Sequence, residues 1–351
     1  MLDLEFHILR RPSAASRRSV EAFLDAQGLA FEGEPDVTVV AEDGDGQVVA
    51  TGSLDGKVIK MVAVDPGRQE GGLSAAILSR LLQVAREEGR THLFVYTKLE
   101  AASRFRSLGF VELARVEPSV VLLEMGEPGV ASFRSYLASE RVEGEGESGA
   151  VVVNANPFTR GHRFLLEEAR RRCDRLYVIV VETDLSLFPF EHRFDLVRRG
   201  AADLDGVVVL RSGDYAVSRA TFPSYFLRGT GDDERALLQT RLDVTLFAEL
   251  FVPALGLSRR FVGTEPYCPV TRRYNEAMKA VLPPRGIEVV EIPRLERLPG
   301  VAVSASSVRE AIRGDDWEAI RALVPDVTYD YLRSSRAEAV LERVRRSESR
   351  H

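Results

Sequence analysis

The chain has 351 residues and a mass of 38.9 kDa, which predicts about two domains at roughly 150 residues each. Its 45% hydrophobic and 28% charged residues exclude a disordered chain. The formal charge of −6 and a pI near 5.6 argue against an extended nucleic-acid-binding surface. Two distant cysteines suit a reducing cytoplasm, and residues 1–10 do not have the pattern of a secretory signal. No apolar run approaches the roughly 20 residues of a membrane-spanning helix.

The N-terminal half has the pattern of an α/β domain with antiparallel strands. Two Asp-Gly turns, at residues 43–46 and 55–56, separate apolar segments and favour hairpins, because Asp-Gly accepts the positive φ that such turns need. The spacing of Ala76, Ile77, Leu81 and Val84 predicts a helix that ends at Gly89. The expected elements are strands at 37–42, 47–54, 57–64, 92–97 and 111–123, and helices at 73–88, 101–107 and 130–141.

A run of alternating glutamate and glycine, residues 143–149, separates the two halves. Glycine loosens the backbone and the like charges keep it solvated, so we expect a linker or an exposed loop. The expected organisation is an N-terminal domain over residues 1–128, a helix and linker over 129–149, and a C-terminal domain over 150–351.

The C-terminal half alternates strand and helix, as a parallel sheet requires. The expected strands are 150–154, 175–181, 207–210, 260–263 and 288–292, the helices between them are 162–173, 191–199 and 233–250, and the closing helices are 306–313, 317–323 and 329–346. This pattern predicts a doubly wound, Rossmann-like sheet, which binds ligands at the carboxyl ends of its strands.

The turn between the first strand and helix of this half has the sequence Asn-Ala-Asn-Pro-Phe-Thr-Arg-Gly-His, residues 154–162. Gly161 would permit close approach of the backbone to a phosphate, and helix N–H groups favour an anion there. His162 could donate to an oxygen that gains charge during phosphoryl chemistry. The alternative is a plain turn in which Thr159 caps the helix and His162 is a surface residue.

Two further segments could join this site. Ser304, Ser306, Ser307 and Arg309 gather hydroxyls and a guanidinium at a helix start, where they could bind phosphate. The alternative is a capping box formed by Ser307 and Glu310. Residues 261–268 end a strand in Gly263 and continue as a polar turn, which could equally be ordinary strand-loop punctuation; Cys268 within it is expected to be an inert thiol.

The Thr159-to-His162 segment resembles the Thr/His-x-Gly-His signature of the nucleotidylyltransferase superfamily, here with threonine in first position. The serine cluster resembles its Ile-Ser-x-x-x-Val-Arg motif. This resemblance implies an ATP site and attack at the α-phosphate, with His162 and Arg309 as catalytic residues. The ATP-binding residues that it implies are Asn156, Phe158, Thr159, Gly161, Gly263, Thr264, Glu265, Ser304, Ser306 and Ser307.

Longer strings resemble one family, the citrate lyase ligases, across essentially the whole chain. They lie at residues 153–159, 188–193, 218–223 and 261–266 and at the serine cluster. The resemblance implies an acid-thiol ligase of the cytoplasm that uses ATP with Mg²⁺ and acetate. It would form acetyl-adenylate and acetylate a dephospho-coenzyme-A-derived thiol on the acyl carrier subunit of citrate lyase. Glu182 departs from the family, since a lysine is expected there; Arg193 or Arg219 could supply the positive charge instead.

An N-terminal acetyltransferase-like (GNAT) domain also belongs to this family. Arg68, Gly71 and Gly72 resemble the pyrophosphate-binding turn of N-acetyltransferases and could hold a coenzyme-A-like arm. The alternative is a retained fold without acetyl transfer of its own. The motifs leave open an acetate ligase for another carrier, such as that of malonate decarboxylase, a plain adenylyltransferase, and a non-catalytic carrier-binding module. No histidine has the spacing of a metal ligand.

Overall fold

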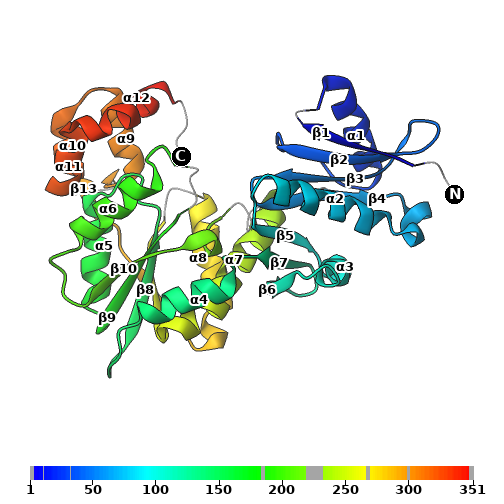
Figure 1. The fold of residues 1–351 in the computed structure, drawn as a ribbon. Coiled ribbons are helices and arrows are strands. Elements are labelled where there is room, and N and C mark those ends of the chain that lie inside the picture. Colours follow the sequence, from blue (N-terminus) through cyan, green and yellow to red (C-terminus); the bar gives the residue numbers. More distant parts are fainter. Residues whose placement is uncertain are drawn as a thin grey trace. The chain divides into compact units, whose positions relative to one another are not determined.

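A computed structural model of the protein describes residues 4–10, 12–31, 33–182, 186–218, 232–265, 269–298 and 301–347. The chain divides into two compact units (Figure 1). Unit 1 comprises Met1–Arg134 and Arg219–Leu246, and unit 2 comprises Ser135–Ser218 and Phe247–His351. The acidic loop before residue 148 therefore lies within unit 2.

Unit 1 is built on a seven-stranded mixed sheet with the order β1-β2-β3-β4-β5-β7-β6. All neighbours are antiparallel except β4 and β5, which are parallel and pair only where Val58 and Ile59 meet Phe94 and Val95. The strands are β1 (Glu5–Arg10), β2 (Val37–Glu42), β3 (Val48–Asp55), β4 (Val58–Val64), β5 (His92–Lys98), β6 (Val111–Val116) and β7 (Val120–Gly126). The helices are α1 (Ala14–Ala26), the 3-10 turn η1 (Pro66–Gly71), α2 (Leu73–Glu87), the 3-10 turn η2 (Leu99–Ala101) and α3 (Ala102–Arg106).

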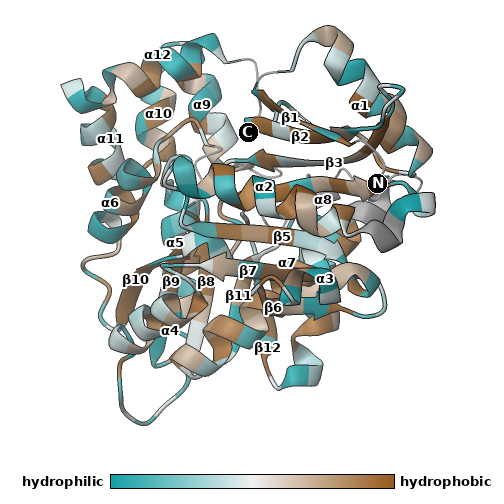
Figure 2. Cartoon of the chain, turned by 45° about the vertical axis from the view of Figure 1, so that its right-hand side comes forward, coloured by the Kyte–Doolittle hydropathy of each residue, from teal (hydrophilic) through white to brown (hydrophobic). Residues whose placement is uncertain are grey.

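Helix α2 packs directly on this sheet because its apolar side chains recur at helical spacing. Ile77 and Leu81 are fully buried. They lie over Gly52 of β3, where a Cβ atom would come within 2.8 Å of the Ile77 side chain, so only glycine allows this close approach. Figure 2 shows the mostly hydrophobic strands of the sheet and the mixed surface of α2.

Three features of unit 1 differ from the sequence prediction. Strand β1 and helix α1 were not expected, because β1 is largely exposed and α1 buries only Val20 and Leu24. The single strand expected at 111–123 is wrong: it is the hairpin β6–β7. The backbone N–H of Ser119 donates to the Val116 carbonyl at 2.8 Å and closes this turn.

Unit 2 is built on five parallel strands with the order β10-β9-β8-β11-β12. They are β8 (Ser148–Val153), β9 (Arg175–Val180), β10 (Val207–Arg211), β11 (Leu257–Gly263) and β12 (Glu288–Ile292). The helices along this part of the chain are α4 (Val130–Ser139), α5 (Arg160–Arg170), α6 (Phe190–Gly200), α7 (Asp232–Leu255) and α8 (Pro269–Val281), with 3-10 turns η3 (Gly213–Tyr215) and η4 (Pro283–Arg285). Helices α4 and α7 cross the division between the units. The expected α/β class is confirmed.

The main core of unit 2 lies on one face of its sheet. Val151 and Val153 of β8 and Val178 and Val180 of β9 pack there against buried side chains of α5, α6 and the closing helices. The closing elements are the small hairpin β13 (Glu296–Leu298) and β14 (Val301–Ala302), then α9 (Ala305–Arg313), α10 (Trp317–Leu323), α11 (Asp326–Arg333), the 3-10 turn η5 (Ser335–Ala337) and α12 (Glu338–Arg346). They gather beside the carboxyl ends of the strands (Figure 1).

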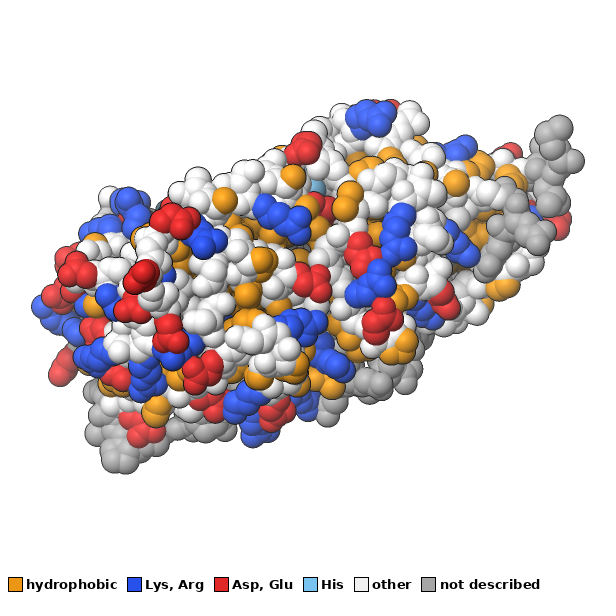
Figure 3. All heavy atoms as spheres, turned by 90° about the horizontal axis from the view of Figure 1, so that it is seen from below, with side chains coloured by type: hydrophobic (Ala, Val, Ile, Leu, Met, Phe, Trp, Pro, Cys, Tyr) orange, Lys and Arg blue, Asp and Glu red, His pale blue; other side chains and the backbone are white. Residues whose placement is uncertain are grey.

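The single closing helix expected at 329–346 is wrong. The chain leaves the helical conformation at Ser334, whose ψ of 157° is extended, and α11 and α12 are separate helices. Helix α8 and the hairpin β13–β14 were not expected. Among the described residues, no helix is long and apolar enough to cross a membrane. On the face drawn in Figure 3, basic and acidic side chains are interspersed.

Strand order reverses between β8 and β11, which continue into α5 on one side and toward α8 on the other. In an open parallel sheet, the carboxyl ends of the strands at such a reversal form a ligand-binding crevice. The residues that follow β8 and β11 are therefore the place to look for a functional site.

Candidate functional site

The turn after β8 is held by its two asparagines and their neighbours. Asn156 is 4% exposed, and its Oδ1 accepts from the backbone N–H of Phe188 at 3.0 Å. The Oδ1 of Asn154 accepts from Arg193 at 2.9 Å and from the Ser186 hydroxyl at 3.0 Å. These bonds tie the end of β8 to the segment before α6, so the start of α5 is held in place from two sides.

Thr159 and His162 form a reciprocal cap at the start of α5. The Oγ1 of Thr159 accepts from the backbone N–H of His162 at 3.2 Å, and the Nδ1 of His162 accepts from the backbone N–H of Thr159 at 3.1 Å. Because a backbone N–H can only donate, Nδ1 is an acceptor, and the neutral ring carries its proton on Nε2. The helix therefore begins at Arg160, two residues before the start expected from the sequence.

The imidazole of His162 is neutral at physiological pH. Burial lowers its pKa to about 4, and the positive charge of Arg294 adds to this effect. The ring also stacks on Phe158, with 5.9 Å between the centroids. Phe158 itself is fully buried, in the core rather than at the surface. The arrangement yields a fixed, uncharged donor at Nε2.

Gly161 is needed because the backbone of another segment passes next to it. A Cβ atom at this position would lie 2.5 Å from the carbonyl oxygen of Val303. Real Cβ atoms do not approach a backbone oxygen so closely. In the structure, Val303 approaches the Gly161 backbone closely. Because Val303 precedes the serine cluster, this contact brings the first turns of α5 and α9 together.

Helix α9 is capped by Ser304 and not by Ser307. Ser304 has extended dihedral angles, and its Oγ accepts from the backbone N–H of Ser307 at 3.1 Å. The sequence prediction of a capping box between Ser307 and Glu310 is therefore wrong, because the helix begins at Ala305 and Ser307 is already in its third position. The Ser307 hydroxyl lies 2.8 Å from that of Ser304, which places two hydroxyls at this helix end.

Arg309 joins the two helix ends from within. Its side chain is buried at 3% exposure, so Arg309 is not a solvated residue of the helix surface. One guanidinium nitrogen donates to the carbonyl of Asn156 at 2.6 Å and the other to the Ser306 hydroxyl at 3.2 Å. Burial lowers the pKa of Arg309, and Arg313 adds to the effect.

The carboxyl ends of β11 and β12 supply a charged pair that borders the site. Glu265 is 9% exposed and forms an ion pair with Arg294. The Nε of Arg294 donates to the carbonyl of Thr264 at 2.7 Å, and the Thr264 N–H donates to Ile292 at 2.9 Å. Gly263 ends β11, and a Cβ atom there would have ordinary contacts.

Arg193 and Glu182, two charged residues that the sequence analysis considered for the phosphate site, form hydrogen bonds and ion pairs with other parts of the protein. Arg193 is fully buried and donates to the carbonyls of Phe188, Asn154 and Val181, at 2.9, 2.8 and 2.6 Å. It therefore braces the ends of β8 and β9 and is not placed as a phosphate ligand. Glu182 accepts from the backbone N–H of Gly213 and pairs with Arg211, and burial raises its pKa. Arg219 and Cys268 lie outside the described residues.

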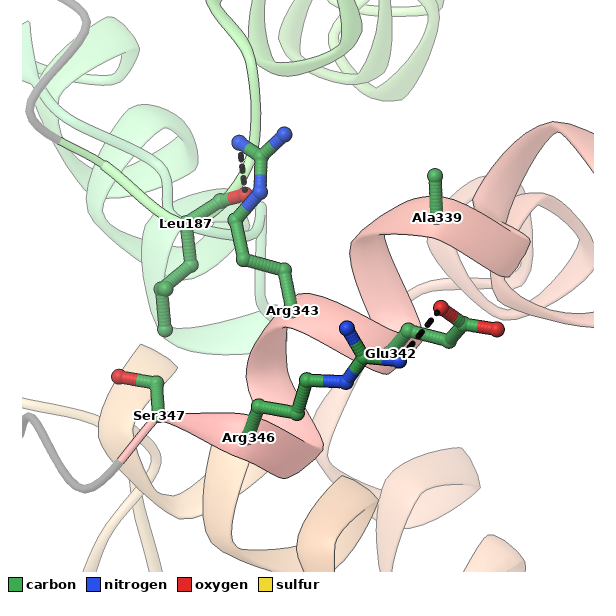
Figure 4. Close-up of a pocket in the computed structure, with 6 residues that line it drawn as sticks. All are labelled: Leu187, Ala339, Glu342, Arg343, Arg346 and Ser347. Atoms are coloured by element: carbon green, nitrogen blue, oxygen red, sulfur yellow. Dashed lines mark hydrogen bonds and ion pairs between the residues drawn. The ribbon is translucent and has the colours of Figure 1, made fainter.

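An open hollow of about 500 Å³ lies behind the segment that binds Asn154 and Asn156. Figure 4 shows Arg343 of α12 reaching Leu187, whose carbonyl accepts from it at 3.3 Å. Arg346 points along the same helix toward Glu342, its ion-pair partner. Leu187 forms the wall of the hollow that is nearer to the site, and α12 forms the other wall.

In unit 1, the turn between β4 and α2 has the geometry of a helix start with an open N-terminus. Asp65 accepts from the backbone N–H of Gly67 at 2.8 Å, and Gly72 has a φ of +69° immediately before α2. Gly71 ends the 3-10 turn. Arg68 pairs with Asp43 at 2.8 Å, and its other terminal nitrogen is buried without a hydrogen-bond partner among the described residues.

The geometry brings most of the residues singled out in unit 2 to one place, the adjoining N-termini of α5 and α9. Backbone N–H groups there have no partners within their helices and attract anions. Sequence reasoning missed Arg294, which follows β12 in a Pro-Arg pair. Its only signal was its position after the last strand of a parallel sheet. The fold and this pair of helix ends define unit 2 as an α/β domain in which two helix N-termini meet at the switch point of a parallel sheet.

Comparison with known proteins gives the family. A family model described as the citrate lyase ligase C-terminal domain matches residues 148–332. The chain is 41% identical over 322 residues to the citrate (pro-3S)-lyase ligase of Klebsiella pneumoniae, covering 90% of this chain and 92% of that protein. It is 37% identical over 339 residues to the Escherichia coli K12 protein of the same name, covering 94% of each. A solved acyl-CoA N-acyltransferase from Pseudomonas aeruginosa aligns with 35% of this chain and 100% of its own, at 16% identity and a TM-score of 0.31.

The chain therefore belongs to the citrate lyase ligase family, as the sequence motifs predicted. The match extends over both units, because the relatives align over at least 90% of the chain.

Proposed function

We propose that the protein is an ATP-dependent acetate:thiol ligase that acetylates the prosthetic-group thiol of the citrate lyase acyl carrier subunit. The observation that carries this proposal is the pair of adjoining helix N-termini, α5 and α9, at the switch point of a parallel sheet. Family membership supports the choice of acid and carrier.

The first step joins acetate to the α-phosphate of ATP. A carboxylate oxygen of acetate attacks the α-phosphorus, the bond to the β-phosphate oxygen breaks, and acetyl-adenylate and pyrophosphate result. Charge accumulates on phosphate oxygens during this step. The Nε2–H of His162 and the N–H groups of α5 and α9 are donors that are fixed before the reaction, so they stabilise this charge without reorganisation.

Two other groups keep this geometry in place. Arg309 fixes the distance between the helix ends by donating to the Asn156 carbonyl, and Ser304 caps α9. The proposed ATP-binding residues Thr159, Gly161, Ser304, Ser306 and Ser307 all lie in or next to these first turns. Asn156 and Phe158 contribute through packing and hydrogen bonds within the protein, while Gly263, Thr264 and Glu265 border the site from β11.

Mg²⁺ would enter with the phosphates of ATP and neutralise part of their charge. Within the described residues, no group of three or more His, Cys, Asp and Glu side chains could hold a metal ion. We propose that the backbone N–H groups and hydroxyls at the starts of α5 and α9 carry the protein's share of phosphate binding.

In the second step the carrier thiol attacks the acetyl carbonyl carbon, and AMP leaves with the oxygen that acetate contributed. We infer that unit 1 holds the coenzyme-A-like arm of the carrier at Arg68, Gly71 and Gly72. Three features support this: the open N-terminus of α2, the buried nitrogen of Arg68, and strands β4 and β5, which pair over only two residues.

The test is pyrophosphate release by the full chain with ATP and a series of acids from formate to butyrate, with and without carrier. We expect release to require a short acid, with acetate the best, and to turn over repeatedly only with the citrate lyase carrier. His162→Asn should abolish most of the release, while His192→Asn, a control histidine on α6 that contacts Tyr331 instead, should not. Release that requires a mononucleotide acceptor in place of an acid would indicate a plain adenylyltransferase, and equal acetylation of a malonate decarboxylase carrier would overturn the carrier assignment.

A further inference from the structure

Arg294 occupies a central position that neither its sequence context nor the motifs around it indicated. It follows β12 by two residues, at the carboxyl edge of the sheet. The next residue, Leu295, accepts from the backbone N–H of Val303 at 2.9 Å, and Val303 is the residue that lies against Gly161. The segment that carries Arg294 is thus hydrogen-bonded to the segment that touches the start of α5.

The charge of Arg294 also reaches the catalytic histidine. Apart from burial, Arg294 is the group that lowers the pKa of His162. A positive charge disfavours a protonated imidazole only at short range in a partly screened environment. The geometric link is Val303, which lies against Gly161 and donates to Leu295, so the segment that carries Arg294 lies next to the start of α5.

The buried arginines on the other side of the site do not supply a charge to it. Arg193 is 0% exposed and donates to three carbonyls, and Arg309 is 3% exposed and holds the Asn156 carbonyl. Arg211 pairs with Glu182 and Glu191. By contrast, the side chain of Arg294 is 29% exposed, so one edge of it faces solvent.

Arg294 is held in a fixed orientation by two acceptors. Its Nε donates to the Thr264 carbonyl at 2.7 Å, and one terminal nitrogen pairs with Glu265, whose side chain is only 4% exposed. A guanidinium has five N–H groups in a rigid fork. Two acceptors on one edge leave the other terminal nitrogen available, and it has no hydrogen-bond partner among the described residues.

We propose that Arg294 binds the phosphate groups of the nucleotide and that Glu265 is the positioning residue that orients it. The inference rests on the proposed function and adds a cation to a site otherwise made of neutral donors. The family resemblance led us to expect a lysine at position 182, where this chain has Glu182. In this proposal the positive charge is supplied by Arg294, which follows β12, instead of by a residue at the end of β9.

The test compares variants in which the buried Glu265 carboxylate has already been neutralised. Removing Arg294 alone would take a counter-charge from that carboxylate and destabilise the fold. The informative comparison is therefore Glu265→Gln against the double variant Arg294→Met with Glu265→Gln, because the two differ only in the guanidinium. Arg285→Met is the matched control, since Arg285 donates to the Val281 carbonyl just before β12, at the opposite end of that strand.

Binding of ATP, inorganic pyrophosphate and adenosine to the full chain is measured by calorimetric titration. We expect the double variant to bind ATP and pyrophosphate at least about tenfold more weakly than Glu265→Gln, which is the loss expected for a charge-assisted hydrogen bond. Adenosine affinity should be equal in the two. Arg294→Lys, which keeps the charge but not the fork, should fall between wild type and the double variant.

Histidine titration by NMR supplies a second readout, which tests whether the charge of Arg294 acts at His162. Because the positive charge of Arg294 is missing, the pKa of His162 should be higher in the double variant than in Glu265→Gln. Equal ATP and pyrophosphate affinities in Glu265→Gln and the double variant would overturn the proposal. This outcome differs from failure of the proposed function itself, in which wild-type protein would release no pyrophosphate with ATP and acetate.

Discussion

Replacing Gly161 by alanine tests whether the adjoining helix ends are a requirement of the fold and of the site. The new Cβ atom would lie 2.5 Å from the carbonyl oxygen of Val303, a backbone atom that cannot rotate away. Val303 is itself fixed through Leu295, so α9 must shift as a whole. Overpacking of this kind costs about 1–3 kcal/mol. At a urea dependence near 2 kcal/mol per M, the unfolding midpoint should fall by about 0.5–1.5 M.

The only tryptophan of the chain reports on this change directly. Trp317 lies in α10, next to α9 and against the core of unit 2, so its fluorescence follows unfolding of that unit. The control is Gly314→Ala at the end of α9, where the nearest atom would be 3.7 Å away and φ is −83°. That variant should be unchanged or more stable by up to about 1 kcal/mol. ATP affinity should fall only in Gly161→Ala. Wild-type stability and ATP affinity in Gly161→Ala would refute the reasoning.

Three further predictions test the site. Ser304→Ala should cost about 1 kcal/mol as loss of the helix cap, whereas Ser307→Ala should cost less; thermal melts of both decide the cap assignment. The folded-state pKa of His162, about 4, lies below the ordinary 6.5, so the unfolded chain binds the proton first and stability should fall as the pH drops from 6.5 to 4, by at most about 3 kcal/mol. His162→Asn should lack this part of the pH dependence in urea titrations followed by fluorescence. Arg309→Met should lose about 1–3 kcal/mol, because the buried Asn156 carbonyl loses its donor, and should weaken ATP binding; an unchanged melt with unchanged ATP affinity would contradict its bridging role.

The elements around the site could be predicted because their signals are local. An apolar run predicted β8 at 150–154, and the structure has Ser148–Val153. Threonine followed three residues later by histidine gave the start of α5 to within two residues. The alternation of strands and helices predicted a parallel sheet. In such a sheet the turn after β8 must lie at the carboxyl edge.

The contacts that assemble the site could not be predicted, because they join distant segments. Arg309 and Asn156 are 153 residues apart in the sequence, and no periodicity reports that one donates to the other. The same holds for Gly161, whose partner is the backbone of Val303. The helix cap at Ser304 was misassigned because three serines in four positions offer nearly equal local choices, and the packing of Val303 against α5 decides between them.

In unit 1 the errors have a related cause. Strand β1 and helix α1 bury few side chains, so neither carries a strong apolar pattern. The hairpin β6–β7 is apolar on both sides of a short turn and therefore looked like one long strand. The assignment of the described residues 232–246 to unit 1 depends on contacts between distant segments and has no signature in the sequence.

The most direct measurement of the central claim follows the oxygen atoms of acetate. Acetate labelled with ¹⁸O in both carboxylate oxygens is incubated with ATP, Mg²⁺, the carrier and the full-length protein, and the products are analysed by mass spectrometry. If acetate attacks the α-phosphate between α5 and α9, one ¹⁸O atom must appear in AMP, and pyrophosphate must carry none. Label in inorganic phosphate together with ADP would show attack at the γ-phosphate and would contradict the account.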